Sequence, residues 1–272
     1  MTDTEYAVVD IGSNSLRLMQ GIFKKGQWRF YPKRLATTRL AKGLNESGHL
    51  SPEGIVNSFA VMEEWNRDLQ GIPVCAVATS AVREARDGQA FLAEVRWRFG
   101  WHCRIASGAE EGALSFCGAV STIPAGTVVA VLDIGGGSTE VALGKDGHVT
   151  WSHSYPLGAV RLTAAEQMGI RELKEVRKRC DETWLRQPVK PEKLIGVGGT
   201  LTSLAAIDAR MDVYDPERVD GYVLSKTDLA GCLHRLASMS DGERKHVPGL
   251  MAQRSTIILA GLVIAESYMD YY

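Results

Sequence analysis

One stretch of this sequence decides the fold: Val131-Leu132-Asp133-Ile134-Gly135-Gly136-Gly137-Ser138-Thr139. A second stretch of the same kind lies near the N-terminus: Val8-Val9-Asp10-Ile11-Gly12-Ser13-Asn14-Ser15. Each is an apolar run rich in β-branched residues that ends in Asp and continues into Gly and small polar residues. Such a run predicts a β-strand followed by a tight loop with bare backbone amides.

The residues after each stretch are also alike. Both copies read as strand, turn and return strand, at residues 16–23, 24–26 and 28–31 in the first copy and 140–143, 145–147 and 149–155 in the second. A strand, a phosphate-sized loop and a hairpin therefore occur twice. Two such copies that face each other across a cleft would grip one ligand from both sides.

Composition and charge argue against several classes of protein. The chain has 272 residues, 45% of them hydrophobic, which is enough for a large core. Its net charge of −1, from 31 basic and 32 acidic residues, indicates neither a nucleic-acid nor a membrane partner. The five cysteines lack CxxC spacing, which argues against a disulfide framework or a zinc site. No signal peptide can be placed at the N-terminus, so we expect a cytoplasmic protein.

A shift in composition predicts the domain boundary. Residues 121–126 read Ser-Thr-Ile-Pro-Ala-Gly, and the second copy begins directly afterwards. Strands alternate with helical segments in both halves; Ser51-Pro52-Glu53, for example, predicts a helix start that continues to about Leu69. The sequence thus predicts an α/β protein of two domains, 1–123 and 124–272, each a mixed sheet flanked by helices. The last helix can pack back on the first domain.

The two glycine-containing loops carry the first chemical argument. Glycine lets the backbone approach an anion closely, and the amides of residues 12–15 and 135–138, with nearby Ser and Asn side chains, can surround phosphate oxygens. Asp10, at the end of the first strand, can hold Mg²⁺ directly or through water. Read alone, the first loop fits a hairpin-entry turn and the second a β-bulge loop. Their repetition in the same context favours a phosphate site.

Two further motifs lie at predicted helix starts. Gly198-Gly199-Thr200 follow a strand and open a helix, whose N-terminus suits a phosphate. In the alternative interpretation, Thr200 only caps an ordinary turn. Glu110 and Glu111 follow a glycine turn, and at most one of these adjacent carboxylates can face a site. Acids in a first helical turn also favour the helix dipole, which is the structural alternative.

Two arginines are candidates for anion binding. Arg83 lies early in a predicted helix, where its guanidinium can point at an anion or pair with Glu84 or Glu53. Arg161 lies beside a predicted turn. The histidines show no ligand spacing, so we assign none of them a role.

These motifs resemble the exopolyphosphatase/guanosine pentaphosphate phosphohydrolase (Ppx/GppA) phosphatase family, in its short two-domain form. The matching segments follow one another along nearly the whole chain: 10–15, 107–111, 133–140, 156–161, 198–200, 218–222 and 254–261. The resemblance implies two actin-like ATPase (ribonuclease H-like) domains with an interdomain cleft. It also implies hydrolysis of a terminal phosphoanhydride that depends on Mg²⁺ or Mn²⁺. Ser255 and Thr256 depart from the family pattern, in which an acid is expected here.

The resemblance also implies roles for individual residues. Glu111 matches the family's proposed water-activating glutamate, Asp133 and Glu140 match acids of the metal and water site, and Asp10 matches their counterpart in the first domain. The residues implied in phosphate binding are Gly12, Ser13, Asn14, Ser15, Arg83, Gly135, Gly136, Gly137, Ser138, Gly198, Gly199 and Thr200.

Our leading hypothesis is an enzyme that releases terminal orthophosphate from inorganic polyphosphate or guanosine pentaphosphate (pppGpp) by attack of water. It needs no nucleic acid or membrane and is compatible with a homodimer. One alternative is an ATP-dependent kinase of the same superfamily, although the Glu110-Glu111 pair fits water activation better. The other is a non-catalytic nucleotide- or alarmone-binding protein.

Overall fold

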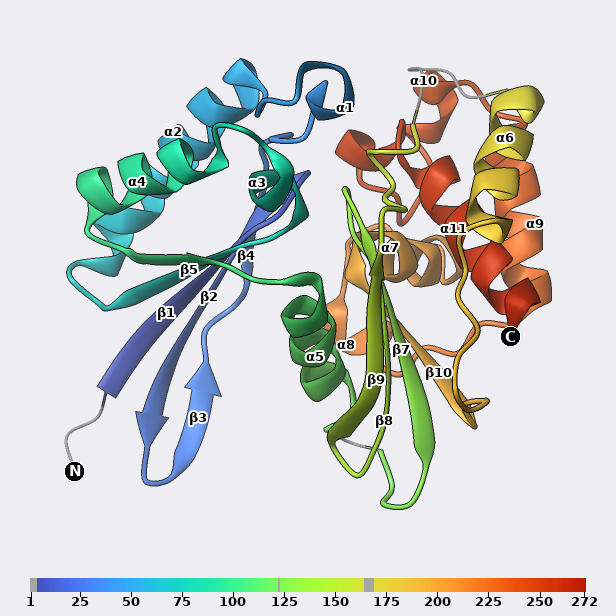
Figure 1. Cartoon of the computed structure of the whole chain (residues 1–272), viewed down its shortest axis with the longest axis horizontal. Coiled ribbons are helices and arrows are strands. Elements are labelled where there is room, and N and C mark those ends of the chain that lie inside the picture. Colours follow the sequence, from blue (N-terminus) through green and yellow to red (C-terminus); the bar gives the residue numbers. More distant parts are fainter. Residues whose placement is uncertain (1–3, 122, 164–168) are drawn as a thin grey trace. The chain divides into compact units, whose positions relative to one another are not determined.

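The computed structural model describes residues 4–121, 123–163 and 169–272 (Figure 1). The chain forms two compact units, residues 1–107 and residues 108–272, and each has its own mixed sheet. The prediction of two mixed sheets flanked by helices is confirmed. The predicted interdomain cleft stays a prediction.

The first unit is built around one sheet. Its elements in chain order are β1 (Thr4–Ile11), β2 (Ser15–Lys24), β3 (Gln27–Phe30), β4 (Arg34–Thr37), α1 (Leu44–Ser47), α2 (Pro52–Leu69), β5 (Val74–Ala78), α3 (Ser80–Glu84), α4 (Gly88–Phe99) and β6 (His102–Ile105). The strand order is β3-β2-β1-β5-β6, and β4 also pairs with β2. β2 is antiparallel to its partners, whereas β5 is parallel to β1 and β6.

Alternating burial shows how this sheet packs. Ala7, Val9 and Ile11 of β1 are buried, whereas the alternate residues Tyr6 and Val8 are exposed. One face therefore enters the core, and α2 and α4 lie together on one side of the sheet (Figure 1). The predicted start of α2 is confirmed, because Pro52 occupies its first turn and the Ser51 side chain accepts a hydrogen bond from the Gly54 N–H at 3.2 Å.

The second unit repeats the strand and hairpin order of the first. Its elements are α5 (Gly108–Ala119), β7 (Val128–Ile134), β8 (Thr139–Lys145), β9 (His148–Tyr155), α6 (Ile170–Asp181), β10 (Lys193–Val197), α7 (Gly198–Asp208), α8 (Pro216–Val219), α9 (Lys226–Ala237), α10 (Asp241–Arg244), the 3₁₀ helix η1 (Ala252–Arg254) and α11 (Ile258–Tyr271). The strand order is β10-β7-β8-β9, with β10 parallel to β7 and the other pairs antiparallel. The predicted repeat of strand, loop and hairpin is confirmed.

Helices cover both faces of this second sheet. Phe116 of α5 packs with Val129 and Val131 of β7, whereas Leu132 and Ile134 belong to the core cluster that contains α11. Because alternate residues of a strand point to opposite faces, α5 and α11 lie on opposite sides of the sheet. α5 therefore belongs with the second unit, and the division at residues 107 and 108 differs from the predicted boundary at residue 123.

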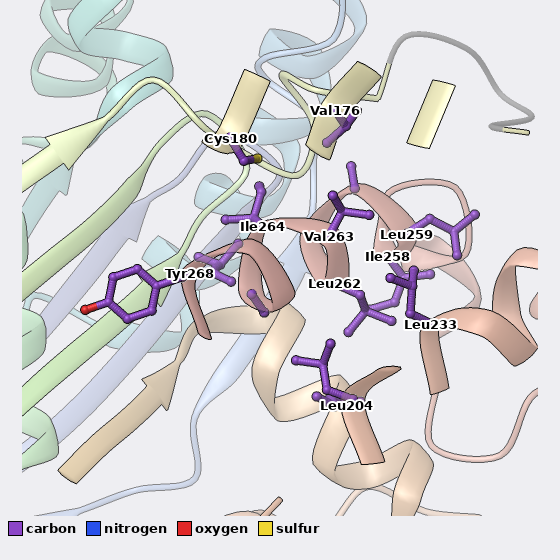
Figure 2. Close-up of a cluster of buried hydrophobic side chains, with 14 of the residues drawn as sticks. Val176, Cys180, Leu204, Leu233, Ile258, Leu259, Leu262, Val263, Ile264 and Tyr268 are labelled. Carbon is purple, nitrogen blue, oxygen red and sulfur yellow. The ribbon is translucent and has the colours of Figure 1, made fainter. Parts of the chain in front are cut away.

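The largest core surrounds α11. The residues from Ile258 to Ala265 are all buried, as expected for a helix that is apolar on every side. Figure 2 shows this helix among Val176 and Cys180 of α6, Leu204 of α7 and Leu233 of α9. Within the described parts of the chain, no helix is both long and apolar enough to cross a membrane.

Candidate active site

The two copies of the opening motif differ in one pair of neighbouring side chains. β1 and β2 place Asp10 beside Arg17, whereas β7 and β8 place Asp133 beside Glu140. In the first copy, Arg17 Nη1 lies 2.6 Å from Asp10 Oδ2, so the aspartate charge is balanced. In the second copy two acids are directly opposite, an arrangement that costs free energy when both are charged. The acidic site therefore lies in the second unit.

Glu140 is the buried centre of this acidic site. Its side chain is 1% exposed, and Ser154 Oγ of β9 donates a hydrogen bond to Oε1 at 2.6 Å. Burial raises the pKa of Glu140 well above its ordinary value, and the charges of Glu111 and Asp133 raise it further. The charges of two further carboxyl groups therefore act on Glu140.

α5 brings the third of these carboxyl groups to the sheet. Ser115 Oγ of α5 donates a hydrogen bond to Asp133 Oδ2 at 2.5 Å, which sets the position of the helix against β7. Glu111 lies four residues earlier and so shares the face of Ser115. The charge of Glu111 also raises the pKa of Glu140. Of the adjacent pair, Glu111 is thus the residue that faces the acidic site.

The triple-glycine loop beside these acids is held by its carbonyl groups. The N–H of Ala159 donates to Gly135 O at 2.9 Å, and the N–H groups of Val160 and Arg161 donate to Gly136 O at 2.8 and 3.0 Å. The Nε of Arg161 donates to Gly137 O at 2.5 Å.

Gly158 makes this close approach possible, because a Cβ atom there would lie 2.3 Å from Gly136 O. In the described part of the chain, the N–H groups of Gly136 and Gly137 have no protein acceptor. The loop therefore presents amide donors in a fixed conformation, as an anion-binding loop requires.

The third glycine motif lies against the same aspartate. Gly198 opens α7 with a φ of +87°, and a Cβ atom there would lie 2.6 Å from Asp133 Oδ1. No side chain caps the start of α7, so the alternative in which Thr200 is a cap is wrong. Thr200 is instead buried against Gly261 of α11, and Arg254 Nη1 donates to Gly199 O at 2.6 Å.

The first unit holds the remaining predicted site residues. Its loop repeats one contact of the second, because the N–H of Gly12 donates to Ser15 O at 3.1 Å as that of Gly135 does to Ser138 O at 2.9 Å. The hydroxyl-bearing residues Ser13 and Ser15 are buried, and Asn14 Nδ2 donates to Ser15 Oγ at 3.3 Å.

Arg83 lies on α3 in the same unit. Its Nη1 donates to Ala106 O, directly after β6, at 2.8 Å. The alternative partner Glu53 pairs instead with Lys42.

One glycine near the acidic site is a test of the packing of α5. A Cβ atom on Gly112 would lie 3.6 Å from the Glu140 Cβ and 3.7 Å from the Ser152 Cβ, which are ordinary contact distances. We expect Gly112→Ala to raise the melting temperature by roughly 2–4 °C, because alanine is the better helix former by about 1 kcal/mol. In Gly108→Ala, the matched variant, the Cβ atom would lie 2.4 Å from that of Ser154, and we expect a lower melting temperature. Thermal denaturation followed by circular dichroism measures both, and a destabilised Gly112→Ala would contradict this packing.

The comparison with known families decides which family the chain belongs to. Residues 23–271 match the model of the Ppx/GppA phosphatase family. The chain belongs to this family. The resemblance inferred from the sequence is therefore confirmed, as is the class of enzyme, a hydrolase of phosphoanhydride bonds.

Individual Ppx/GppA relatives match along the whole chain. Exopolyphosphatase 2 of Mycobacterium tuberculosis is 29% identical over 289 residues, covering 98% of this chain and 90% of the relative. The solved Ppx/GppA family member of Aquifex aeolicus is 29% identical with a TM-score of 0.79, covering 99% of this chain and 90% of that one. An exopolyphosphatase from Cytophaga hutchinsonii, 22% identical, shows the fold alone, with a TM-score of 0.89 and coverage of 98% and 90%. The predicted actin-like fold is confirmed.

The acidic site of this Ppx/GppA protein has the donor chemistry that Mg²⁺ prefers. Within residues 4–121, 123–163 and 169–272, no group of three or more His, Cys, Asp or Glu side chains is arranged to hold a metal by itself. Mg²⁺, however, is commonly held by one or two carboxylates together with water and substrate phosphates. Asp133 and Glu140 supply such oxygen donors, and a cation would offset the repulsion that raises the pKa of Glu140. The donor chemistry therefore fits Mg²⁺, which stays a prediction.

Sequence reasoning missed two hydroxyl groups of this site. Ser115 and Ser154 hydrogen-bond to Asp133 and Glu140, respectively. Ser115 carried a signal, since it lies one helical turn after Glu111. Ser154 carried none, because its place opposite Glu140 depends on the register of β8 and β9, which contains an irregularity at Leu143 and Gly144.

Proposed function

We propose that this protein is an exopolyphosphatase that releases terminal orthophosphate from inorganic polyphosphate. The observation that carries the proposal is an acidic site beside a loop with amide donors, in which Asp133 lies opposite Glu140 and the charge of Glu111 also acts on Glu140. The family match and the relatives named exopolyphosphatase support the substrate class.

Each group of the site has its own role in the proposed hydrolysis. The amides of Gly136 and Gly137 hold phosphate oxygens, and Arg83 of the first unit is a cation that can bind a phosphate of the substrate. Glu111 orients the attacking water and accepts its proton, and the positive end of the α5 dipole favours the negative charge that this role needs. Asp133 and Glu140 would hold Mg²⁺, and Asp10 would do so in the first unit. Bound there, Mg²⁺ would neutralise the charge that develops on the phosphoryl oxygens.

The position of Glu111 favours hydrolysis over phosphoryl transfer to another acceptor. It lies in the first turn of α5, and it acts electrostatically on Glu140. A carboxylate beside the phosphate loop can take a proton from water without any second substrate.

A panel of substrates tests the proposal. We expect orthophosphate release with Mg²⁺ from long polyphosphate and from tripolyphosphate, with pppGpp as a second substrate and ATP as a poor one. The reaction needs no acceptor, so a requirement for one would indicate a kinase instead. Tight binding of the same compounds without turnover would contradict hydrolysis and favour the nucleotide- or alarmone-binding alternative. Repeating the assay with EDTA and with Mn²⁺ tests the metal requirement.

A further inference from the structure

The segment from Thr38 to Ala41 in the first unit donates hydrogen bonds to the carbonyl groups of the Gly12–Ser15 loop. The N–H groups of Thr38 and Arg39 both donate to Asn14 O at 3.0 Å, and the N–H of Ala41 donates to Ser13 O at 2.9 Å. This segment follows β4 and leads to α1 (Figure 1). These hydrogen bonds to its carbonyl groups fix the conformation of the Gly12–Ser15 loop, as similar bonds fix the triple-glycine loop of the second unit.

The two holding segments share a pattern. In each, two consecutive N–H groups donate to one carbonyl of the loop, and the second belongs to an arginine, Arg39 in one unit and Arg161 in the other. The guanidinium of Arg161 is used within the protein, since it donates to Gly137 O. The guanidinium of Arg39 makes no hydrogen bond or ion pair with any residue that the structure describes, and the residue is exposed. By contrast, the nearby Lys42 pairs with Glu53.

The backbone of Arg39 is held in an unfavourable conformation. Its φ is +59°, in the left-handed region that glycine or asparagine adopts more readily. Two contacts prevent it from relaxing. The N–H of Lys42 donates to Arg39 O at 3.1 Å, and Gly54 of α2 lies so close that a Cβ atom there would be 2.8 Å from the same oxygen. A strained arginine with an exposed, unused charge beside a phosphate loop indicates a functional side chain.

We propose that Arg39 is a further substrate-binding residue, whose guanidinium contacts a phosphate of the polyphosphate chain next to the one held by the Gly12–Ser15 loop. The proposal rests on the proposed function and adds a residue that the sequence reasoning had left without a role. The buried hydroxyl of the adjacent Thr38, which has no partner in the described part of the chain, is consistent with a ligand at this place.

Arg39→Gly isolates the guanidinium from the backbone. Glycine keeps the N–H that donates to Asn14 O and adopts a positive φ without strain, so we expect a melting temperature that is no lower. We expect the KM for polyphosphate to rise about tenfold, the loss expected for a charge-assisted hydrogen bond, with a smaller change in kcat. Arg39→Lys, which keeps the charge, should recover part of the loss.

Lys25→Gly is the matched control. Lys25 is also basic, exposed and at a positive φ of 51°, but it lies in the β2–β3 turn, at the end of β2 remote from the loop. We expect it to leave the KM unchanged. An unchanged KM in Arg39→Gly, or an equal rise in Lys25→Gly, overturns the role of Arg39.

Binding measurements separate this inference from the proposed function. Isothermal titration with tripolyphosphate is performed on the wild type and on Arg39→Gly. If the wild type binds but does not hydrolyse and Arg39→Gly binds more weakly, Arg39 keeps its role and hydrolysis fails. If the wild type hydrolyses and Arg39→Gly binds equally well, hydrolysis stands and the role of Arg39 fails. A wild type that neither binds nor hydrolyses overturns both.

Discussion

Glu111→Gln is expected to lower the rate of orthophosphate release by about 10²–10⁴-fold, the contribution of a general base. Glutamine keeps the size of the side chain but cannot accept the proton of the attacking water. The Ser115 contact to Asp133, which positions α5, does not involve Glu111, so the fold should persist. Steady-state kinetics with polyphosphate measure the effect, and the loss should appear in kcat rather than in KM.

Glu110→Gln is the matched control for this variant. It makes the same chemical change one residue earlier on the same helix, where the side chain points in a different direction. We therefore expect nearly normal kcat for Glu110→Gln. Full turnover in Glu111→Gln, or equal losses in both variants, would contradict the role of Glu111 as the base.

Glu140→Gln is expected to abolish most activity and yet to stabilise the metal-free protein. Activity falls because the carboxylate that would hold Mg²⁺ is removed. The free energy of unfolding rises because the cost of burying a charge beside Glu111 and Asp133 disappears. At mildly alkaline pH and with EDTA, we expect the free energy of unfolding to increase by on the order of 1–3 kcal/mol. Each kcal/mol corresponds to roughly 2–4 °C in melting temperature. Differential scanning calorimetry measures the gain.

The stability of the metal-free protein should depend on pH through Glu140. Because the pKa of Glu140 is higher in the folded than in the unfolded protein, the contribution of the protonated group is fully present below its ordinary pKa. That contribution is lost as the pH rises toward the folded pKa, so the metal-free wild type should become less stable over this range. Glu140→Gln should remove this part of the slope, whereas Glu175→Gln, a change at an exposed position of α6, should keep it. If the stability of the wild type and of Glu140→Gln changed with pH in parallel, the idea that burying the Glu140 charge is costly would be refuted.

The elements of the fold were predictable where the pattern is local. The two strand-loop-hairpin copies and the start of α2 are encoded by alternating apolar residues, glycines and a Ser-Pro pair within a few positions. The position of the division between the two units could not be predicted from local sequence. The Pro-Gly segment at residues 121–126 looked like a boundary, but α5 precedes it and packs through Phe116 on strands that follow it. Such a contact depends on the complementary surfaces of distant elements.

The candidate site was predictable in its residues but only partly in its arrangement. The sequence pointed to Asp133, Glu140 and Glu111, but Ser115, which joins α5 to Asp133, was missed although its place one helical turn after Glu111 was a local signal for it. The place of Thr200 in a glycine motif suggested a phosphate ligand or a cap. It does not cap α7 and is buried against Gly261 of α11, and its role as a phosphate ligand stays a prediction.

By itself, the sequence determined that the chain carries two matching phosphate-sized loops on strands, since glycine content and strand alternation act over a few residues. Only the tertiary structure decided that the copies differ in charge, with Asp10 balanced by Arg17 and Asp133 facing Glu140. It also decided that Glu140 is buried, because α5 must pack on β8 to exclude water from that carboxyl group. Burial and neighbouring charge, which set the behaviour of an acid, are properties of the assembled fold.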